Sequence, residues 1–82
     1  YWAGAKKACD DIGMSLPDKS KLESLAKKTT AEKEQLGLPT DGWFWSSSEN
    51  IATLVYTVLF YNGNAANANK GYSYLKVLCV GD

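Results

Sequence analysis

Two cysteines are the residues of this chain with the most definite chemistry. Cys9 and Cys79 lie near opposite ends of an 82-residue sequence, so a disulfide between them would close almost the whole chain into a loop. Loop entropy assigns such a crosslink about 4 kcal/mol of stability. Small disulfide-bonded domains are typical of oxidising compartments. The alternative is two separate buried thiols. The favoured interpretation, a disulfide, predicts an extracellular or cell-surface protein, with the periplasmic side also open.

The other polar residues do not assemble a catalytic or metal site. The sequence has no His and two Cys, so one chain cannot supply zinc with four nitrogen or sulfur ligands. Glu32 and Glu34 lie beside Lys33 on a predicted exposed helix face, where solvation is the ordinary role of such charges. The serines at 46–48 have no His to activate them. We therefore expect no enzymatic activity, no cofactor and no bound metal.

Charge and length exclude further classes of protein. Nine basic residues, all lysines, balance nine acidic residues, and the net charge is zero. A nucleic-acid partner has no electrostatic support in such a chain. The longest mostly apolar run, residues 51–61, is about half of the roughly 20 residues that a membrane-spanning helix needs. We expect no nucleic-acid partner and no direct membrane contact from this segment.

The elements predicted around the two cysteines place both of them toward one core. Residues 1–12 form a predicted amphipathic helix that ends at Gly13, and less polar residues recur along it at spacings of three and four: Trp2, Ala5, Cys9 and Ile12. Residues 72–80 form a predicted last strand, in which alternate residues share the inner face: Ser73, Leu75, Val77 and Cys79. These periodicities make a disulfide geometrically sensible.

Between them the chain changes from helical to strand patterns. A second helix is predicted after Pro17, with Asp18 or Ser20 as its N-cap, and a shorter helix over residues 30–36, with Thr29 and Glu32 as a capping box. The strand half is predicted as a short strand at 43–45, a loop at 46–50, a central strand at 53–61 covered on both faces, a turn at Asn62 and Gly63, and a return strand at 64–68. We expect one α+β domain over residues 1–82.

Four motifs in this order resemble C-type-lectin-like domains. They are residues 2–13 (WAGAKKACDDIG), Leu16 with Pro17 before a capped helix, residues 43–49 (WFWSSSE) and residues 78–80 (LCV). Within that fold the chain is most similar to the compact bacterial branch named after the C-terminal domain of the Lcl collagen-like adhesin. The resemblance implies a compact C-type-lectin-like fold, two N-terminal helices before a small antiparallel sheet, a disulfide from the first helix to the last strand, and a binding role at the cell surface.

The same resemblance leaves two functions open. We expect a noncatalytic extracytoplasmic recognition or adhesion domain for a surface glycan or a protein ligand. The alternative is the globular head of a type IV pilin-like or pseudopilin subunit, whose partners would be neighbouring filament subunits. Sugar-binding C-type lectins hold calcium with Glu-Pro-Asn or Gln-Pro-Asp and with Trp-Asn-Asp. None of these tripeptides occurs here, so no calcium site is carried over.

The candidate ligand residues are aromatic rings that could stack on a ligand and polar side chains that could hydrogen-bond to it. They are predicted to gather on a patch formed by the Asn-rich hairpin at 62–69 and the loop at 46–50. The candidates are Trp45, Glu49, Asn50, Tyr61, Asn62, Asn64, Asn67, Asn69 and Tyr72; further aromatic faces are Trp43, Tyr56 and Tyr74. The competing interpretation makes Trp43 and Trp45 core residues that face one way, with Phe44 facing the other.

Overall fold

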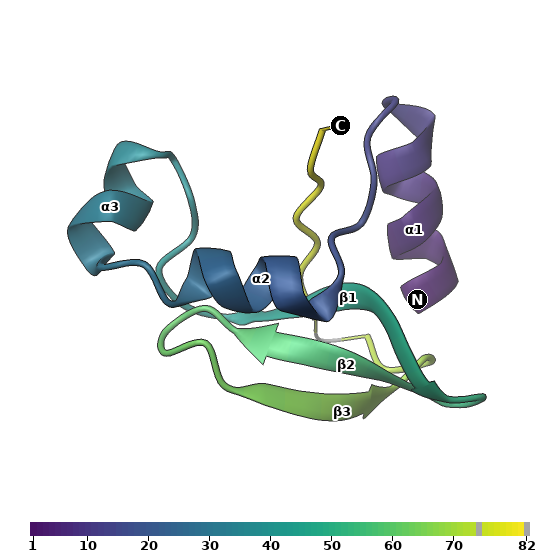
Figure 1. The fold of residues 1–82 in the computed structure, drawn as a ribbon. Helices are drawn as coiled ribbons and strands as arrows, with labels where there is room; N and C mark the ends of the chain where they lie inside the picture. Colours follow the sequence, from purple (N-terminus) through teal and green to yellow (C-terminus); the bar gives the residue numbers. More distant parts are fainter. Residues whose placement is uncertain (74, 82) are drawn as a thin grey trace.

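In a computed structural model that describes residues 1–73 and 75–81, helices precede an antiparallel sheet (Figure 1). The described elements are α1 (Trp2–Asp11), α2 (Lys19–Ala26), α3 (Thr30–Gln35), β1 (Trp43–Ile51), β2 (Leu54–Leu59) and β3 (Ala65–Asn69). The strand order is β1-β2-β3, and both neighbouring pairs are antiparallel. The α+β class and the central position of the predicted strand at 53–61 are confirmed.

Capping residues determine where the helices begin and end. The side chain of Asp18 accepts a hydrogen bond from the backbone N–H of Lys21 at 2.7 Å and is the N-cap of α2. Thr29 and Glu32 form the predicted capping box at α3. Just beyond α1, Gly13 has a φ of 73°, a left-handed conformation that glycine adopts without a steric penalty.

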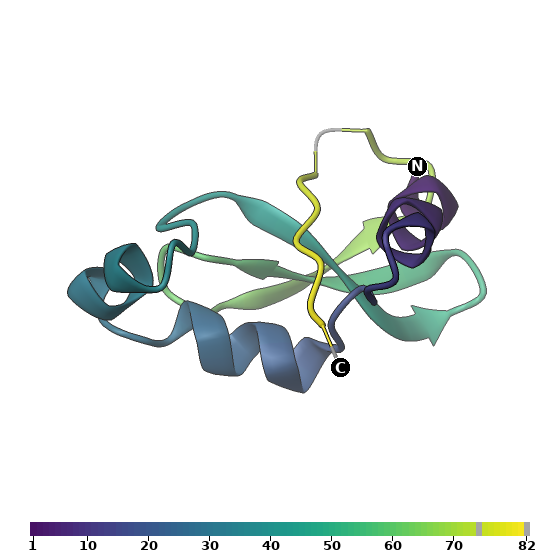
Figure 2. The ribbon, with the colours of Figure 1, turned by 90° about the horizontal axis from the view of Figure 1, so that it is seen from above.

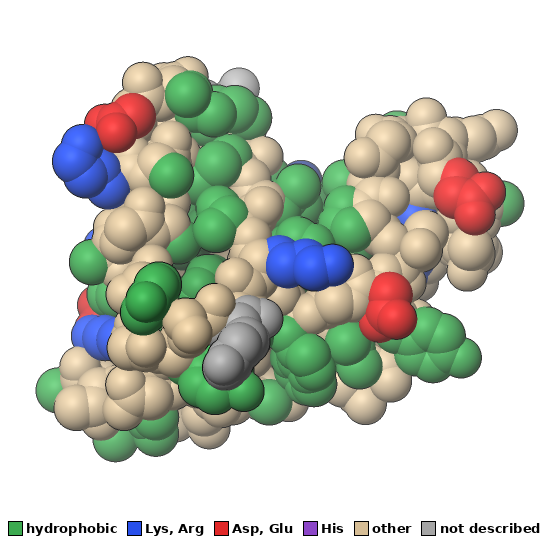
Figure 3. All heavy atoms as spheres, turned by 180° about the vertical axis from the view of Figure 1, so that it is seen from behind, with side chains coloured by type: hydrophobic (Ala, Val, Ile, Leu, Met, Phe, Trp, Pro, Cys, Tyr) green, Lys and Arg blue, Asp and Glu red, His purple; other side chains and the backbone are tan. Residues whose placement is uncertain are grey.

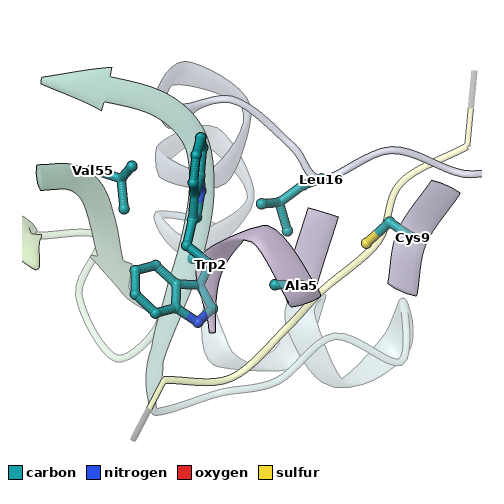
Figure 4. Close-up of a cluster of buried hydrophobic side chains, with 6 residues drawn as sticks. Trp2, Ala5, Cys9, Leu16 and Val55 are labelled. Carbon is teal, nitrogen blue, oxygen red and sulfur yellow. The ribbon is translucent and has the colours of Figure 1, made fainter. Parts of the chain in front are cut away.

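Alternate residues of the strands pack into two separate buried clusters. The first cluster joins α1 to the sheet and consists of Trp2, Ala5, Cys9, Leu16, Trp45 and Val55 (Figure 4). The second joins α2 to the other face of the sheet and consists of Leu22, Ala26, Phe44, Val58 and Phe60. Consecutive strand residues point to opposite faces. The opposite orientations of Phe44 and Trp45, and the burial of β2 on both faces, are therefore confirmed.

The disulfide between Cys9 and Cys79 is confirmed. Their Cα atoms lie 5.4 Å apart, although the two residues are separated by 70 positions in the sequence. Leu75 and Cys79 both pack, partly buried, against the α1 cluster. The C-terminal segment runs between α1 and α2 in both ribbon views (Figures 1 and 2). The crosslink thus joins α1 to the C-terminal end of the chain.

The predicted loop over residues 46–50 is wrong, because these residues continue β1. The pairing with β2 shifts register between Trp45 and Glu49. At this irregularity, Ser46 Oγ donates to the carbonyl oxygen of Tyr56 at 2.6 Å. The hydroxyl thereby satisfies a backbone acceptor where the regular ladder is interrupted. A serine run that has the composition of a loop forms an irregular strand instead.

The predicted last strand over residues 72–80 is wrong as well. Its described residues add no strand to the sheet and make two isolated bridges, Phe44 with Lys76 and Ser15 with Val80. Tyr74 lies outside the described residues. The pairing along β1 does not continue past Lys76, because the backbone N–H of Ser47 donates to the Pro17 carbonyl oxygen at 2.8 Å. A different segment of the chain covers this part of β1.

Four side chains lie on the side opposite to the prediction, and one of them is Ser73, which is exposed. Ile12 is 64% exposed, because α1 ends one residue earlier, and Val77 is 42% exposed, because its segment is not part of the sheet. Lys33 is only 2% exposed and donates from Nζ to the carbonyl oxygen of Phe60 at 2.5 Å. This bond satisfies the buried ammonium group and anchors α3 beside the end of β2.

Candidate functional site

A hollow of about 370 Å³ lies on the sheet face that α1 covers only in part. After β3 the chain crosses this face and reaches the outer edge of β1, where Lys76 N–H donates to the carbonyl oxygen of Trp43 at 2.9 Å. The described lining residues come from all three strands and from this crossing segment: Trp43, Thr57, Ala66, Asn67, Ala68, Asn69, Tyr72 and Leu75. The volume is at the lower end of the range typical of ligand pockets.

The side chains that line the hollow are mainly apolar. The indole of Trp43, the methyl groups of Ala66 and Ala68, and the side chain of Leu75 supply apolar surface. The Thr57 hydroxyl is already satisfied, because it donates to the Ala66 carbonyl oxygen at 3.1 Å. Such a hollow can bury one apolar group of a ligand while nearby polar groups orient the rest.

Two lining asparagines are held in place by hydrogen bonds. Asn67 Oδ1 accepts from Asn50 Nδ2 at 3.1 Å, across the sheet from the end of β1. Asn69 Oδ1 accepts from the backbone N–H of Gly71 at 2.9 Å and shapes the turn that leaves β3. Because Asn67 and Asn69 alternate with Ala66 and Ala68, their side chains point away from the hollow, and they contribute backbone to its lining.

The predicted ligand residues do not form one patch. Trp45 is 1% exposed inside the α1 cluster, so its ring cannot stack on a ligand. Glu49 is paired with Val55 at one end of β2, whereas the hairpin begins after Leu59 at the other end. Three predicted residues lie at the hairpin, Tyr61, Asn62 and Asn64, and three line the hollow, Asn67, Asn69 and Tyr72. The structure divides the predicted residues between the two ends of the sheet: Asn50 contacts Asn67 of β3, whereas Tyr61, Asn62 and Asn64 lie at the other end of β2.

Glu49 takes part in a charged cluster at the surface of the domain. Lys70 Nζ lies 2.6 Å from Glu49 Oε2. The hydrogen bond from Lys70, and then its positive charge, hold the pKa of the Glu49 carboxyl below its usual value. Lys70 and Lys6 also lie over the Trp2 ring, at 4.6 and 4.5 Å from its centroid. The cluster links β1, α1 and the turn after β3.

Trp43, one of the further aromatic faces named from the sequence, lines the hollow. Other lining residues were not among the sequence candidates: Thr57, Ala66, Ala68 and Leu75. One local signal was present, since Ala66 and Ala68 alternate with Asn67 and Asn69 in β3. Small side chains at every second position of a strand leave one face of it open. The hollow also needs the crossing segment, however, and no local pattern indicates that path.

The described part of the chain offers no cluster of three His, Cys, Asp or Glu side chains arranged to hold a metal ion. Among the helices of residues 1–73 and 75–81, none has the length and hydropathy that spanning a membrane requires.

Comparisons with known proteins place the chain in a family. Neither the curated proteins nor the solved structures contain a significant match. One family model does match, over residues 1–81, and it is described as a domain of unknown function, DUF8780. Because the match extends over nearly all of the sequence, the chain belongs to the DUF8780 family.

Proposed function

We propose that the domain is a noncatalytic extracytoplasmic recognition or adhesion module, and that its surface ligand, a glycan or a protein, occupies the hollow. One observation carries the proposal. The small side chains of β3 and the crossing segment leave an open, largely apolar space of about 370 Å³ beside an indole. A largely apolar hollow with an aromatic ring at its wall is the usual form of a ligand-binding site.

Two further features support the proposal. The disulfide is of the kind that persists in oxidising compartments, in agreement with a place outside the cytoplasm. The side chains of Asn67 and Asn69 point away from the hollow, and their hydrogen bonds to Asn50 and to the turn after β3 hold the strand in place. A surface ligand would therefore meet a prearranged site rather than a flexible loop.

A matched pair of substitutions in β3 tests the proposal. Ala66 faces the hollow with its partner Thr57, whereas Ala65 is paired with Val58 and faces the other side of the sheet. Both alanines are exposed. We expect Ala66→Leu to fill the hollow and to abolish binding of ligands selected from a glycan array or a displayed peptide library. Ala65→Leu should leave that binding unchanged.

A tyrosine pair gives a second comparison. Tyr72 lines the hollow and is 50% exposed, whereas Tyr61 is 71% exposed at the hairpin and does not line it. Tyr72→Ala should weaken binding and Tyr61→Ala should not. Equal binding by all four variants would refute the hollow as the ligand site. Self-association that Ala66→Leu abolishes would instead favour the filament-head alternative.

A further inference from the structure

The outer edge of β3 carries backbone groups that the sheet does not use. Hydrogen-bonded pairs alternate along an antiparallel ladder. Leu59 N–H donates to the Asn64 carbonyl oxygen at 2.8 Å, and Lys70 N–H donates to the Thr53 carbonyl oxygen at 3.0 Å. Counting inward from both bonds makes Ala66 and Ala68 the bonded residues of β3. The backbone groups of the alternate residues, Ala65, Asn67 and Asn69, therefore point away from β2.

Five of these outward groups are available to a neighbouring strand. They are the N–H and C=O groups of Ala65 and Asn67 and the N–H group of Asn69, and no other described residue bonds to them. The carbonyl oxygen of Asn69 is used, because it accepts from Tyr72 N–H at 2.9 Å. In Figure 1 no helix or strand lies beyond β3 on this side.

Nothing in the sequence of β3 protects this edge from pairing. Natural edge strands usually carry a charge, a proline or a bulge that discourages a further strand. The sequence of β3 is AANAN, its register with β2 is regular, and all of its side chains are uncharged. An exposed and regular edge of this kind is the template for strand addition by a ligand.

We propose that an extended peptide segment of a protein ligand adds a fourth strand to β3 and inserts a large apolar side chain into the hollow. The inference deepens the proposed function, because it uses the same hollow and names the ligand class. A strand added at the usual spacing of about 4.8 Å aligns alternate side chains with Ala66 and Ala68. Both of these residues line the hollow, so one side chain of the added strand reaches it.

The size of the hollow favours a peptide of another protein over a second copy of this chain. Self-pairing through β3 would present only Ala and Asn side chains to a space of about 370 Å³. A large apolar residue fills such a space better and gains more from leaving water. The uncharged edge also favours a neutral segment; seen from behind, charged side chains appear as separate spots on the surface (Figure 3).

The test uses a neutral heptapeptide of alternating Thr and Val with one central Phe, and the same peptide with Ala in place of Phe. Amide hydrogen exchange of the whole domain is measured by NMR with and without peptide. We expect the Phe peptide to protect the amides of Ala65, Asn67 and Asn69, with little change at Ala66 and Ala68, which are already bonded to β2. Replacing Phe by Ala should weaken binding at least tenfold.

Two changes separate the edge from the hollow. In the added strand, alternate peptide N–H groups face β3 and the others face solvent. N-methylation of the first set should abolish binding, and N-methylation of the second set should leave it unchanged. This comparison needs no protein variant. Ala66→Leu should reduce the affinity for the Phe peptide to that for the Ala peptide, and Ala65→Leu is the matched control.

Each remaining result has one meaning. Phe-dependent shifts at the hollow without protection of β3 overturn strand addition and preserve the proposed site. Protection of β3 with equal affinity for both peptides preserves strand addition and refutes the hollow. No binding of either peptide overturns the inference, and protection that depends on domain concentration alone assigns the edge to a second copy.

Discussion

The two outer edges of the sheet differ in how their backbone groups are satisfied. At β1, Lys76 bonds to both Trp43 and Trp45, and the Pro17 carbonyl oxygen accepts from Ser47. These contacts come from segments far away in the sequence. At β3, the outward groups of Ala65 and Asn67 have no backbone partner among residues 1–73 and 75–81. One edge therefore closes the fold, and the other is free to be paired.

The difference teaches that contacts from distant segments of the chain, rather than strand length, decide which sheet edge can pair with a further strand. β1 is the longest of the described strands, and its outer edge is covered, whereas the outer edge of the shorter β3 is not. The indole of Trp2 adds to this cover, since its Nε1–H donates to the Ser46 carbonyl oxygen at 2.8 Å. The disulfide then fixes the segments that cover β1, because Cys9 follows Trp2 in α1 and Cys79 follows Lys76.

The largest expected effect is loss of the disulfide. The double variant Cys9→Ala/Cys79→Ala should lose up to about 4 kcal/mol of unfolding free energy, because the unfolded chain regains the entropy of an open loop. Urea denaturation measures this loss. Native-state exchange should rise more at the amides of Trp45 and Lys76 than at those of Ala66 and Ala68. Equal increases at both edges would contradict the idea that the crosslink specifically holds the cover of β1.

Proline in β3 should separate the inner from the outer backbone groups. Ala68→Pro removes an N–H that the pairing register assigns to a bond with β2 and should cost about 2 kcal/mol. Ala65→Pro removes an outward N–H and should cost less than about 1 kcal/mol, since the pairing register assigns no bond within the domain to this group. Thermal and urea denaturation of the two variants check the difference. Equal costs would show that the alternation of bonded groups is not the one inferred.

The contact between Trp2 and β1 gives a smaller effect. Trp2→Phe keeps a ring in the α1 cluster but leaves the carbonyl oxygen of Ser46 without its indole donor. We expect a loss of about 1.5 kcal/mol from this unsatisfied buried acceptor. Urea denaturation measures it, and Tyr61→Phe, at an exposed ring, is the matched control. A loss of unfolding free energy no larger than that of the control would show that the Trp2 indole does not stabilise the covered edge of β1.

The smallest expected effect is a dependence on pH at the end of the sheet. The pKa of the Glu49 carboxyl is lower in the folded protein than in the unfolded chain. The ionised carboxylate therefore contributes its full stabilisation at a pH above its unfolded-state pKa. That contribution is lost as the pH falls through the lower folded-state pKa. Glu49→Gln should remove this part of the dependence of stability on pH.

Melting temperatures of the wild type and of Glu49→Gln, recorded from neutral into acidic pH, check the expectation. The difference between the two proteins should shrink as the pH falls, and added salt should reduce it at neutral pH. The pKa of Glu32 is also lowered, chiefly by its hydrogen bond with Thr29, so the variant keeps part of the dependence. A difference that is constant with pH would contradict the role of the ion pair with Lys70.

The helices could be predicted because their signals are local. Gly13, Asp18 and the pair of Thr29 with Glu32 lie within one turn of the ends that they determine. The central strand and the hairpin after it could be predicted as well, since the alternating pattern of the strand and the Asn62–Gly63 turn need no distant contact. The disulfide followed from composition and from the inner face of α1.

The irregular β1 and the path of the C-terminal segment could not be predicted. Ser46 bonds to Tyr56 through its hydroxyl, and Ser47 bonds to Pro17; both contacts depend on tertiary placement. The same limit applied to the site. Asn67, which was among the predicted ligand residues, does line the hollow, but the hollow exists only because a distant segment crosses the sheet.

The disulfide also determines how the domain would transmit mechanical load. A tension applied between residues 1 and 81 would enter through α1, cross the sulfur–sulfur bond at Cys9 and Cys79, and leave through the last residues. The residues enclosed by the crosslink, among them the whole sheet and the hollow, lie outside this load path. While the crosslink is intact, the backbone between the two cysteines, including the sheet, would therefore carry no tension from such a pull.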